Sequence, residues 1–156
     1  MTSKPAASNT VSTQPASASF TRHLPTVARC LLGLVFFASG VFGLLLVFGL
    51  VPMPAPKGPQ SEAATAFMVG LMKAGYLFPL IKVTEVLAGA FLLANRCVPF
   101  ALVLLAPVVV NIFAVHAFLM PEGLAVASAI VVLEAYLGWA YRAAFRPLFA
   151  LRTRAA

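Results

Sequence analysis

Ionisable or strongly polar side chains interrupt several apolar stretches of this sequence. Five of them are Lys82, Glu85, Asn111, His116 and Glu134. Charge is costly in hydrocarbon, so such residues usually pair with one another or line a cavity, and they mark the first place to look for function. We therefore predict that these five residues form a polar binding site within the membrane. Their types leave open whether the protein is an enzyme, and we assign no catalytic residue.

Two interpretations of Lys82 and Glu85 are open. Because they lie three residues apart on one predicted helix, they can face one another as an ion pair that neutralises both charges. Alternatively, Lys82 extends to the outer headgroups and leaves Glu85 to contact Asn111 or His116. A carboxyl group in this second arrangement would suit a proton carrier or a hydrogen-bond donor to a quinone carbonyl.

The other two ionisable residues are His116, which is open to two interpretations, and Glu134. His116, close to the predicted outer interface, is either a packing residue or one that exchanges protons with a ligand or contacts it. Glu134 is predicted to face the helix bundle and form a hydrogen bond there. The sequence has neither a CxxCH motif nor the spacing of zinc ligands, so we predict no metal site.

The elements that must position these side chains are membrane helices. Of the 156 residues, 62% are hydrophobic and only 10% are charged, whereas soluble domains are about a quarter charged. We therefore predict an all-α integral membrane protein. Its net charge of +7 would suggest nucleic acid as the partner of a soluble domain, but membrane lipid explains basic residues that flank apolar segments. We predict no nucleic-acid partner.

The apolar segments predict a four-transmembrane-helix bundle over residues 25–146, with a short interfacial helix between spans one and two. A bilayer core requires roughly 20 residues per helix, and the predicted spans cover about 27–51, 76–94, 98–119 and 124–143. The short helix is expected at Ala63–Ala74, with Ser61 as its N-cap and Gly75 as its C-terminal stop, either at the interface or as a re-entrant element.

The remaining residues are predicted tails, and their charges predict the orientation. Residues 1–24 form a disordered N-terminal tail and residues 147–156 a basic cytoplasmic tail. Since cytoplasmic segments carry the excess of Lys and Arg, we predict a multi-pass protein of the inner (plasma) membrane with both termini cytoplasmic. The predicted outer side holds Lys57 and Lys73, whereas the predicted cytoplasmic side holds Lys4, Arg22, Arg29, Arg96, Arg142, Arg146, Arg152 and Arg154.

Helix geometry predicts how deep the polar groups lie. At about 1.5 Å per residue, Glu85 and Asn111 lie roughly 12 to 13 Å inward from the outer ends of their spans. Ser39 and Glu134 lie roughly 15 to 18 Å deep by the same measure. Four helices therefore each bring a polar group to a similar level, and we predict one shared, inward-facing cluster.

Three segments together form a pattern that is not generic for hydrophobic helices: RCLLGLVFFASGVFGL (29–44), EVLAGAFLLANR (85–96) and VPFALVLLAPVVVNIFAVHAFL (98–119). This pattern resembles the DoxX family of small bacterial four-helix membrane proteins, over about Arg29–Arg146. The resemblance implies that the family's polar positions correspond to Glu85, Asn111 and His116. It also implies redox chemistry at the membrane. Some relatives are subunits of a thiosulfate:quinone oxidoreductase, and others associate with thiol-redox and superoxide-detoxifying partners.

Three functional hypotheses follow. The favoured one is a membrane subunit of a quinone-linked or thiol-redox assembly, with redox partner proteins and a quinone as the candidate ligand. The chain lacks a redox-active cysteine pair, a flavin motif and a haem signature, so we expect no cofactor held by the chain itself. The second hypothesis is a small-molecule or proton-conducting transporter. The third is a structural or assembly protein of the membrane without a ligand.

Overall fold

The computed structural model describes residues 17–54 and 61–145. This part of the chain consists of helices and short connections and contains no strand, which confirms the predicted all-α fold. The helices are α1 (Ser17–Val47), α2 (Glu62–Lys73), α3 (Leu77–Leu93), α4 (Val98–Phe118), the 3-10 turn η1 (Pro121–Gly123), α5 (Leu124–Ala140) and α6 (Arg142–Phe145).

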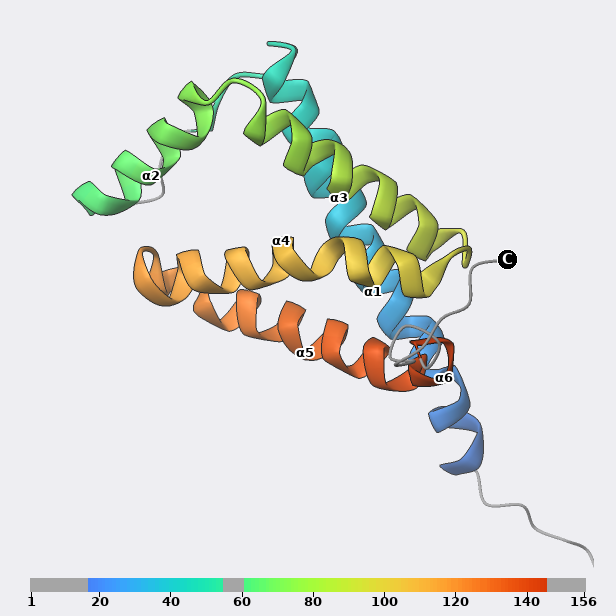
Figure 1. Ribbon diagram of the computed structural model, residues 1–156. Helices are drawn as coiled ribbons and strands as arrows, with labels where there is room; N and C mark the ends of the chain where they lie inside the picture. The colour runs from blue at the N-terminus through green and yellow to red at the C-terminus, as the bar shows by residue number, and fades with distance from the viewer. Residues whose placement is uncertain (1–16, 55–60, 146–156) are drawn as a thin grey trace, which may run out of the picture.

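The long helices form two pairs: α1 packs mainly against α3, and α4 packs along α5 while also contacting α3. The pairs meet near the α3–α4 turn and diverge toward the opposite end, where α2 extends from α3 (Figure 1). Each long helix contributes a fully buried side chain to the core between the pairs: Leu32 and Phe36 from α1, Leu92 from α3, Leu105 from α4 and Leu137 from α5. The divergence leaves the other end open for a pocket.

Several helices are suited to crossing a bilayer. Three stretches are long and apolar enough on their own: His23–Val47, Val98–Phe118 and Pro121–Ala140. α3 has 17 residues, a length of about 25 Å, and it meets the same criterion together with α2, from which it is bent by 85°. The chain is therefore a multi-pass membrane protein, with three or four membrane-crossing helices in its described part.

The first helix differs from its prediction at both ends. α1 begins at Ser17, inside the stretch predicted to be a disordered tail, and it continues through Pro25. Extending an existing helix adds one hydrogen bond per residue, so the long apolar segment can support residues upstream of it. The helix ends at Val47, earlier than predicted, because Gly49 adopts a left-handed conformation with φ 69°. Residues 1–16 and the basic tail 147–156 lie outside the described residues.

The short helix α2 and its junction with α3 follow local sequence signals. The Ser61 hydroxyl accepts a hydrogen bond from the backbone N–H of Ala64 at 3.1 Å, as an N-cap does. Gly75 has φ 73°, a conformation that residues with a Cβ rarely adopt, and it lies at the bend between the two helices. The sharp turn at Gly75 directs α2 away from the α1–α3 pair (Figure 1).

The α3 helix is held at its C-terminal end by Arg29 of α1. The guanidinium of Arg29 is buried and donates hydrogen bonds to the backbone oxygens of Leu92 and, at 3.4 Å, Leu93. These carbonyls lie in the last turn of α3, where intrahelical partners are missing. Arg29 therefore ties α1 to α3 near the α3–α4 turn in addition to flanking the first span.

Candidate functional site

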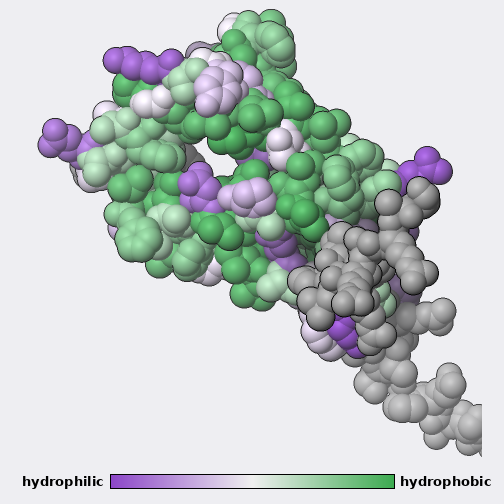
Figure 2. Space-filling model, viewed as in Figure 1, coloured by the Kyte–Doolittle hydropathy of each residue, from purple (hydrophilic) through white to green (hydrophobic). Residues whose placement is uncertain are grey.

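A cavity of about 840 Å³ lies between α2, α3 and α4. Most of its lining is aliphatic or aromatic, and its charged or strongly polar side chains are Lys82, Glu85, Asn111 and His116. The space-filling view shows a hollow between the arms of the molecule with hydrophilic residues beside it (Figure 2). Ligand pockets in proteins typically have volumes of roughly 300 to 1,000 Å³ and a few polar groups on apolar walls. The structure thus brings four of the five predicted site residues to one pocket.

Lys82 and Glu85 form an ion pair in the wall contributed by α3. The Lys82 ammonium lies 2.9 and 2.8 Å from the two carboxylate oxygens of Glu85. It also donates to the hydroxyl of Ser39 on α1 at 3.3 Å. The side chain of Glu85 is 2% exposed and that of Lys82 is 14% exposed, so the pair is largely withdrawn from its surroundings. Of the two arrangements that the sequence left open, the structure has the ion pair.

The stem of Lys82 lies in a space that α1 leaves free for it. A Cβ at Gly43 would collide with the Cγ, Cδ and Cε atoms of Lys82. The ammonium also lies 5.4 Å from the centre of the Phe78 ring, within the range of a cation–π interaction. These contacts direct Lys82 toward Glu85 and Ser39.

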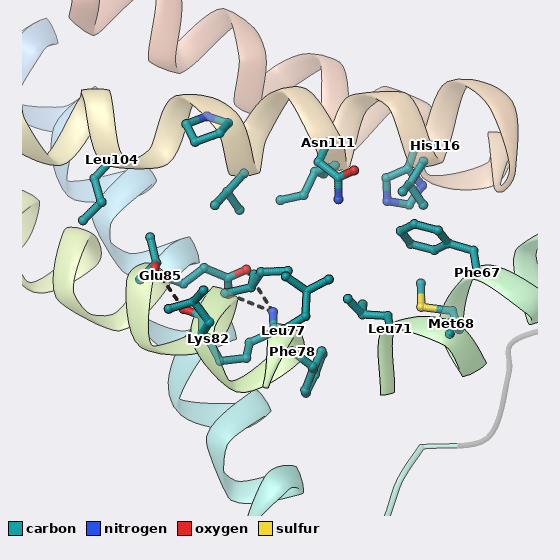
Figure 3. Close-up of a pocket in the computed structure, with 18 of the residues that line it drawn as sticks. Phe67, Met68, Leu71, Leu77, Phe78, Lys82, Glu85, Leu104, Asn111 and His116 are labelled. Atoms are coloured by element: carbon teal, nitrogen blue, oxygen red, sulfur yellow. Dashed lines mark hydrogen bonds and ion pairs between the residues drawn. The ribbon is translucent and has the colours of Figure 1, made fainter. Parts of the chain in front are cut away.

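Asn111 faces the same pocket from α4 (Figure 3). Its side-chain amide has no hydrogen-bond partner among the described residues. A primary amide carries two N–H donors and a carbonyl acceptor, so Asn111 can bind a ligand through either function. Asn111 is therefore the polar group of this wall with the most unused hydrogen-bonding capacity.

His116 lies further along α4, opposite Phe67 of α2 in the close-up view (Figure 3). Its Nδ1 is 3.0 Å from the backbone oxygen of Met120, four residues further along the chain. The ring also fills the space where a Cβ at Gly123 would stand. One edge of the His116 ring is thus packed and hydrogen-bonded, and the residue also lines the pocket. The packing role and the ligand-contacting role predicted from the sequence are therefore compatible.

Glu134 lies apart from this cluster. It belongs to α5 and does not line the pocket. Its Oε1 is buried and has no hydrogen-bond partner among the described residues, contrary to the predicted hydrogen bond. Equal depth in the membrane does not place two side chains on facing sides of their helices, and α5 packs on α4 and α1 rather than on α3. The structure therefore separates Glu134 from the other four predicted site residues.

The contribution of α2 to the site was not predicted from the sequence. α2 adds Phe67, Met68 and Leu71 to the pocket lining, beside Leu77 and Phe78 at the start of α3 (Figure 3). The signals for such a wall were present, because α2 has a capped start, a glycine stop and apolar residues at helical spacing. These sequence signals did not predict the direction of the 85° bend that brings α2 over the pocket.

Comparison with known proteins gives one match. A family model described as DoxX matches residues 24–117, which include every residue that lines the pocket. The matched range ends before η1 and α5, so Glu134 lies outside it as well as outside the pocket. No curated protein and no solved structure matches the chain. Since the match covers more than half of the 156 residues, the resemblance inferred from the sequence is confirmed: the chain belongs to the DoxX family.

Proposed function

We propose that this protein is the membrane subunit of a redox assembly and that the pocket between α2, α3 and α4 binds a quinone. The observation that supports this most directly is the apolar pocket of about 840 Å³. One of its walls carries the His116 imidazole and the Asn111 amide, which has no hydrogen-bond partner among the described residues. A quinone has a flat head with two carbonyl acceptors and an apolar tail. Such a molecule needs few polar contacts and much apolar surface.

Each wall of the pocket has a role in this proposal. The amide of Asn111 donates a hydrogen bond to a carbonyl oxygen of the head. The aromatic and aliphatic side chains of α2 and of the start of α3, which include Phe67, Leu71 and Leu77, cover the ring and the beginning of the tail. The ion pair of Lys82 and Glu85 supplies a polar surface whose charges are already balanced, so it orients the head without an uncompensated charge.

The redox partners in this proposal are other proteins. The sequence contains no CxxC pair, no flavin motif and no haem signature, so partner subunits would supply the groups that carry electrons to or from the quinone. We place the assembly at the inner (plasma) membrane with both termini of this chain cytoplasmic. The basis for this orientation is the concentration of Lys and Arg on the side that holds the termini and the α3–α4 turn.

The proposal is tested by binding. The protein, purified in mild detergent and transferred to lipid nanodiscs, is titrated with a short-tailed quinone, and extracted lipids and co-purifying proteins are identified by mass spectrometry. Asn111→Leu keeps the approximate volume and removes the amide, so we expect roughly tenfold weaker binding, as for the loss of one hydrogen bond.

Thr84→Val is the matched control. Thr84 also lines the pocket, but its hydroxyl proton is already donated to the Leu80 carbonyl at 2.9 Å, so it cannot donate to a quinone carbonyl. Its quinone affinity should remain that of the wild type. An absence of quinone binding by the wild-type protein, together with a co-purifying water-soluble solute, would contradict the proposal and favour a transporter.

A further inference from the structure

The ring of His116 is fixed by the turn that follows α4. Its Nδ1 edge faces the Met120 carbonyl oxygen at 3.0 Å, and the ring occupies the space above Gly123 that a Cβ would fill. A side chain packed on one edge and hydrogen-bonded through it has little freedom to turn over. The orientation of the ring therefore decides which nitrogen is available to the pocket.

This hydrogen bond determines the chemistry of the other nitrogen. A backbone carbonyl oxygen only accepts hydrogen bonds, so Nδ1 must carry the proton and donate it to Met120. In a neutral imidazole with a protonated Nδ1, Nε2 is an acceptor. Nε2 has no hydrogen-bond partner among the described residues. The histidine thus offers a fixed acceptor rather than a donor to a ligand in the pocket.

The two polar groups of the α4 wall consequently make different demands on a ligand. The Asn111 amide can satisfy a carbonyl or a hydroxyl, because it both donates and accepts. Nε2 of neutral His116 can satisfy a hydroxyl group but not a carbonyl oxygen, whose lone pairs would face its own. A carbonyl held there would lose its contacts with water and gain none.

From this arrangement we propose that the pocket selects the reduced, hydroxyl-bearing form of the quinone couple, with a ring hydroxyl of the hydroquinone donating to Nε2 of His116. This inference rests on the proposed function and adds the oxidation state that the site prefers. The basis of selectivity is a hydrogen bond that one form makes and the other cannot, so it acts against the dicarbonyl form as well as in favour of the hydroquinone.

The test compares three ligands with the same ring and tail: the hydroquinone, the quinone and the hydroquinone dimethyl ether. Titrations of the nanodisc-embedded wild type are done without oxygen and at one fixed pH for all three ligands. We expect the hydroquinone to bind roughly tenfold more tightly than either of the other two. Because all three titrations use the wild-type protein, misfolding of a variant cannot account for a difference in affinity.

Variants then assign the preference to the imidazole. His116→Phe retains a flat ring but lacks Nε2, so the hydroquinone should lose its advantage. Gly138→Ala on α5 lies outside the pocket lining and has room for the added methyl group, so it should keep that advantage. Equal binding of the three ligands to the wild type, or an unchanged preference in His116→Phe, would overturn this inference while quinone binding itself stood. Failure of all three ligands to bind would overturn it together with the proposed function.

Discussion

The ammonium group of Lys82 has oxygen partners on two helices, both carboxylate oxygens of Glu85 on α3 and the hydroxyl of Ser39 on α1. Each charge of this pair makes the other tolerable in an apolar environment. Removing one partner leaves the other charge buried and unpaired, which costs far more than removing both. The pair therefore has to be tested with double as well as single substitutions.

The prediction for this pair concerns stability. Glu85→Leu should lower the free energy of unfolding by about 3 kcal/mol, because the Lys82 ammonium loses its counter-charge. Lys82→Met combined with Glu85→Leu should recover to within about 1 kcal/mol of the wild type. The measurement is unfolding by denaturing detergent, followed by circular dichroism.

Glu134→Leu is the matched control for a carboxyl group in a membrane helix. Its Oε1 already lacks a partner among the described residues, so removing the carboxyl should leave the stability unchanged or raise it. If Glu85→Leu were as stable as the wild type, the carboxylate would not be compensating a buried charge, and Lys82 would have to reach the headgroups instead.

The rise per residue gives the predicted levels of these side chains along their helices, but it does not give their directions. Depth follows from the rise per residue along a helix, but the contact of Ser39 on α1 with Lys82 on α3 was not among the predicted pairings. Direction depends on which helices pair and on rotation about each helix axis, which a single sequence with weakly amphipathic helices does not determine. Glu134 illustrates the difference, since its helix faces other neighbours.

At the scale of elements, the close approach of α1 and α3 positions the ion pair. Glycines on both helices allow it: a Cβ at Gly40 would lie 2.8 Å from the Lys82 backbone oxygen, and a Cβ at Gly89 would lie 2.6 Å from the Phe37 nitrogen. Small residues at such contacts let membrane helices pack closely. Gly40 and Gly43 of α1 thus pack against Lys82 of α3, whereas Gly89 of α3 packs against Gly33 and Phe37 of α1.

A pair of identical substitutions tests this contact. Gly89→Ala should lower the free energy of unfolding by about 1 to 3 kcal/mol, because the new methyl group meets backbone atoms that cannot move aside. Gly138→Ala on α5 has no atom within 4 Å of the added methyl, and it should raise stability by about 0.5 to 1 kcal/mol through better helix propensity. Thermal unfolding of both variants in the same detergent makes the comparison.

The prediction requires that Gly89→Ala and Gly138→Ala change the free energy of unfolding in opposite directions. If Gly89→Ala were stabilising like Gly138→Ala, the α1–α3 contact would be looser than the structure has it, and the position of Lys82 would lose its support. Unchanged quinone binding in Gly138→Ala is expected as well, because α5 does not line the pocket.

Over the whole molecule, the turn between α3 and α4 and the start of α1 share one end, joined by Arg29. The opposite end carries the divergence of the two helix pairs and the pocket (Figure 1). If the charge bias sets the orientation, the α3–α4 turn faces the cytoplasm and the pocket opens nearer the outer half of the bilayer.

This orientation can be measured with a native cysteine. Cys97 is free and exposed in the α3–α4 turn. In a Cys30→Ser background, a membrane-impermeant maleimide should label Cys97 in inside-out vesicles and not in intact spheroplasts. Labelling in intact spheroplasts would reverse the proposed topology but would leave the binding experiments unaffected.

The hollow bounded by α2, α3 and α4 has a further consequence for any affinity that is measured. The recess of about 840 Å³ is largely apolar. We expect acyl chains or detergent tails, rather than water alone, to occupy it when no quinone is bound. Lipid or detergent molecules, which are in large excess, then compete with the quinone for the pocket. Apparent dissociation constants should scale with the mole fraction of ligand in the membrane rather than with its bulk concentration, and they should shift when saturated lipids replace unsaturated ones.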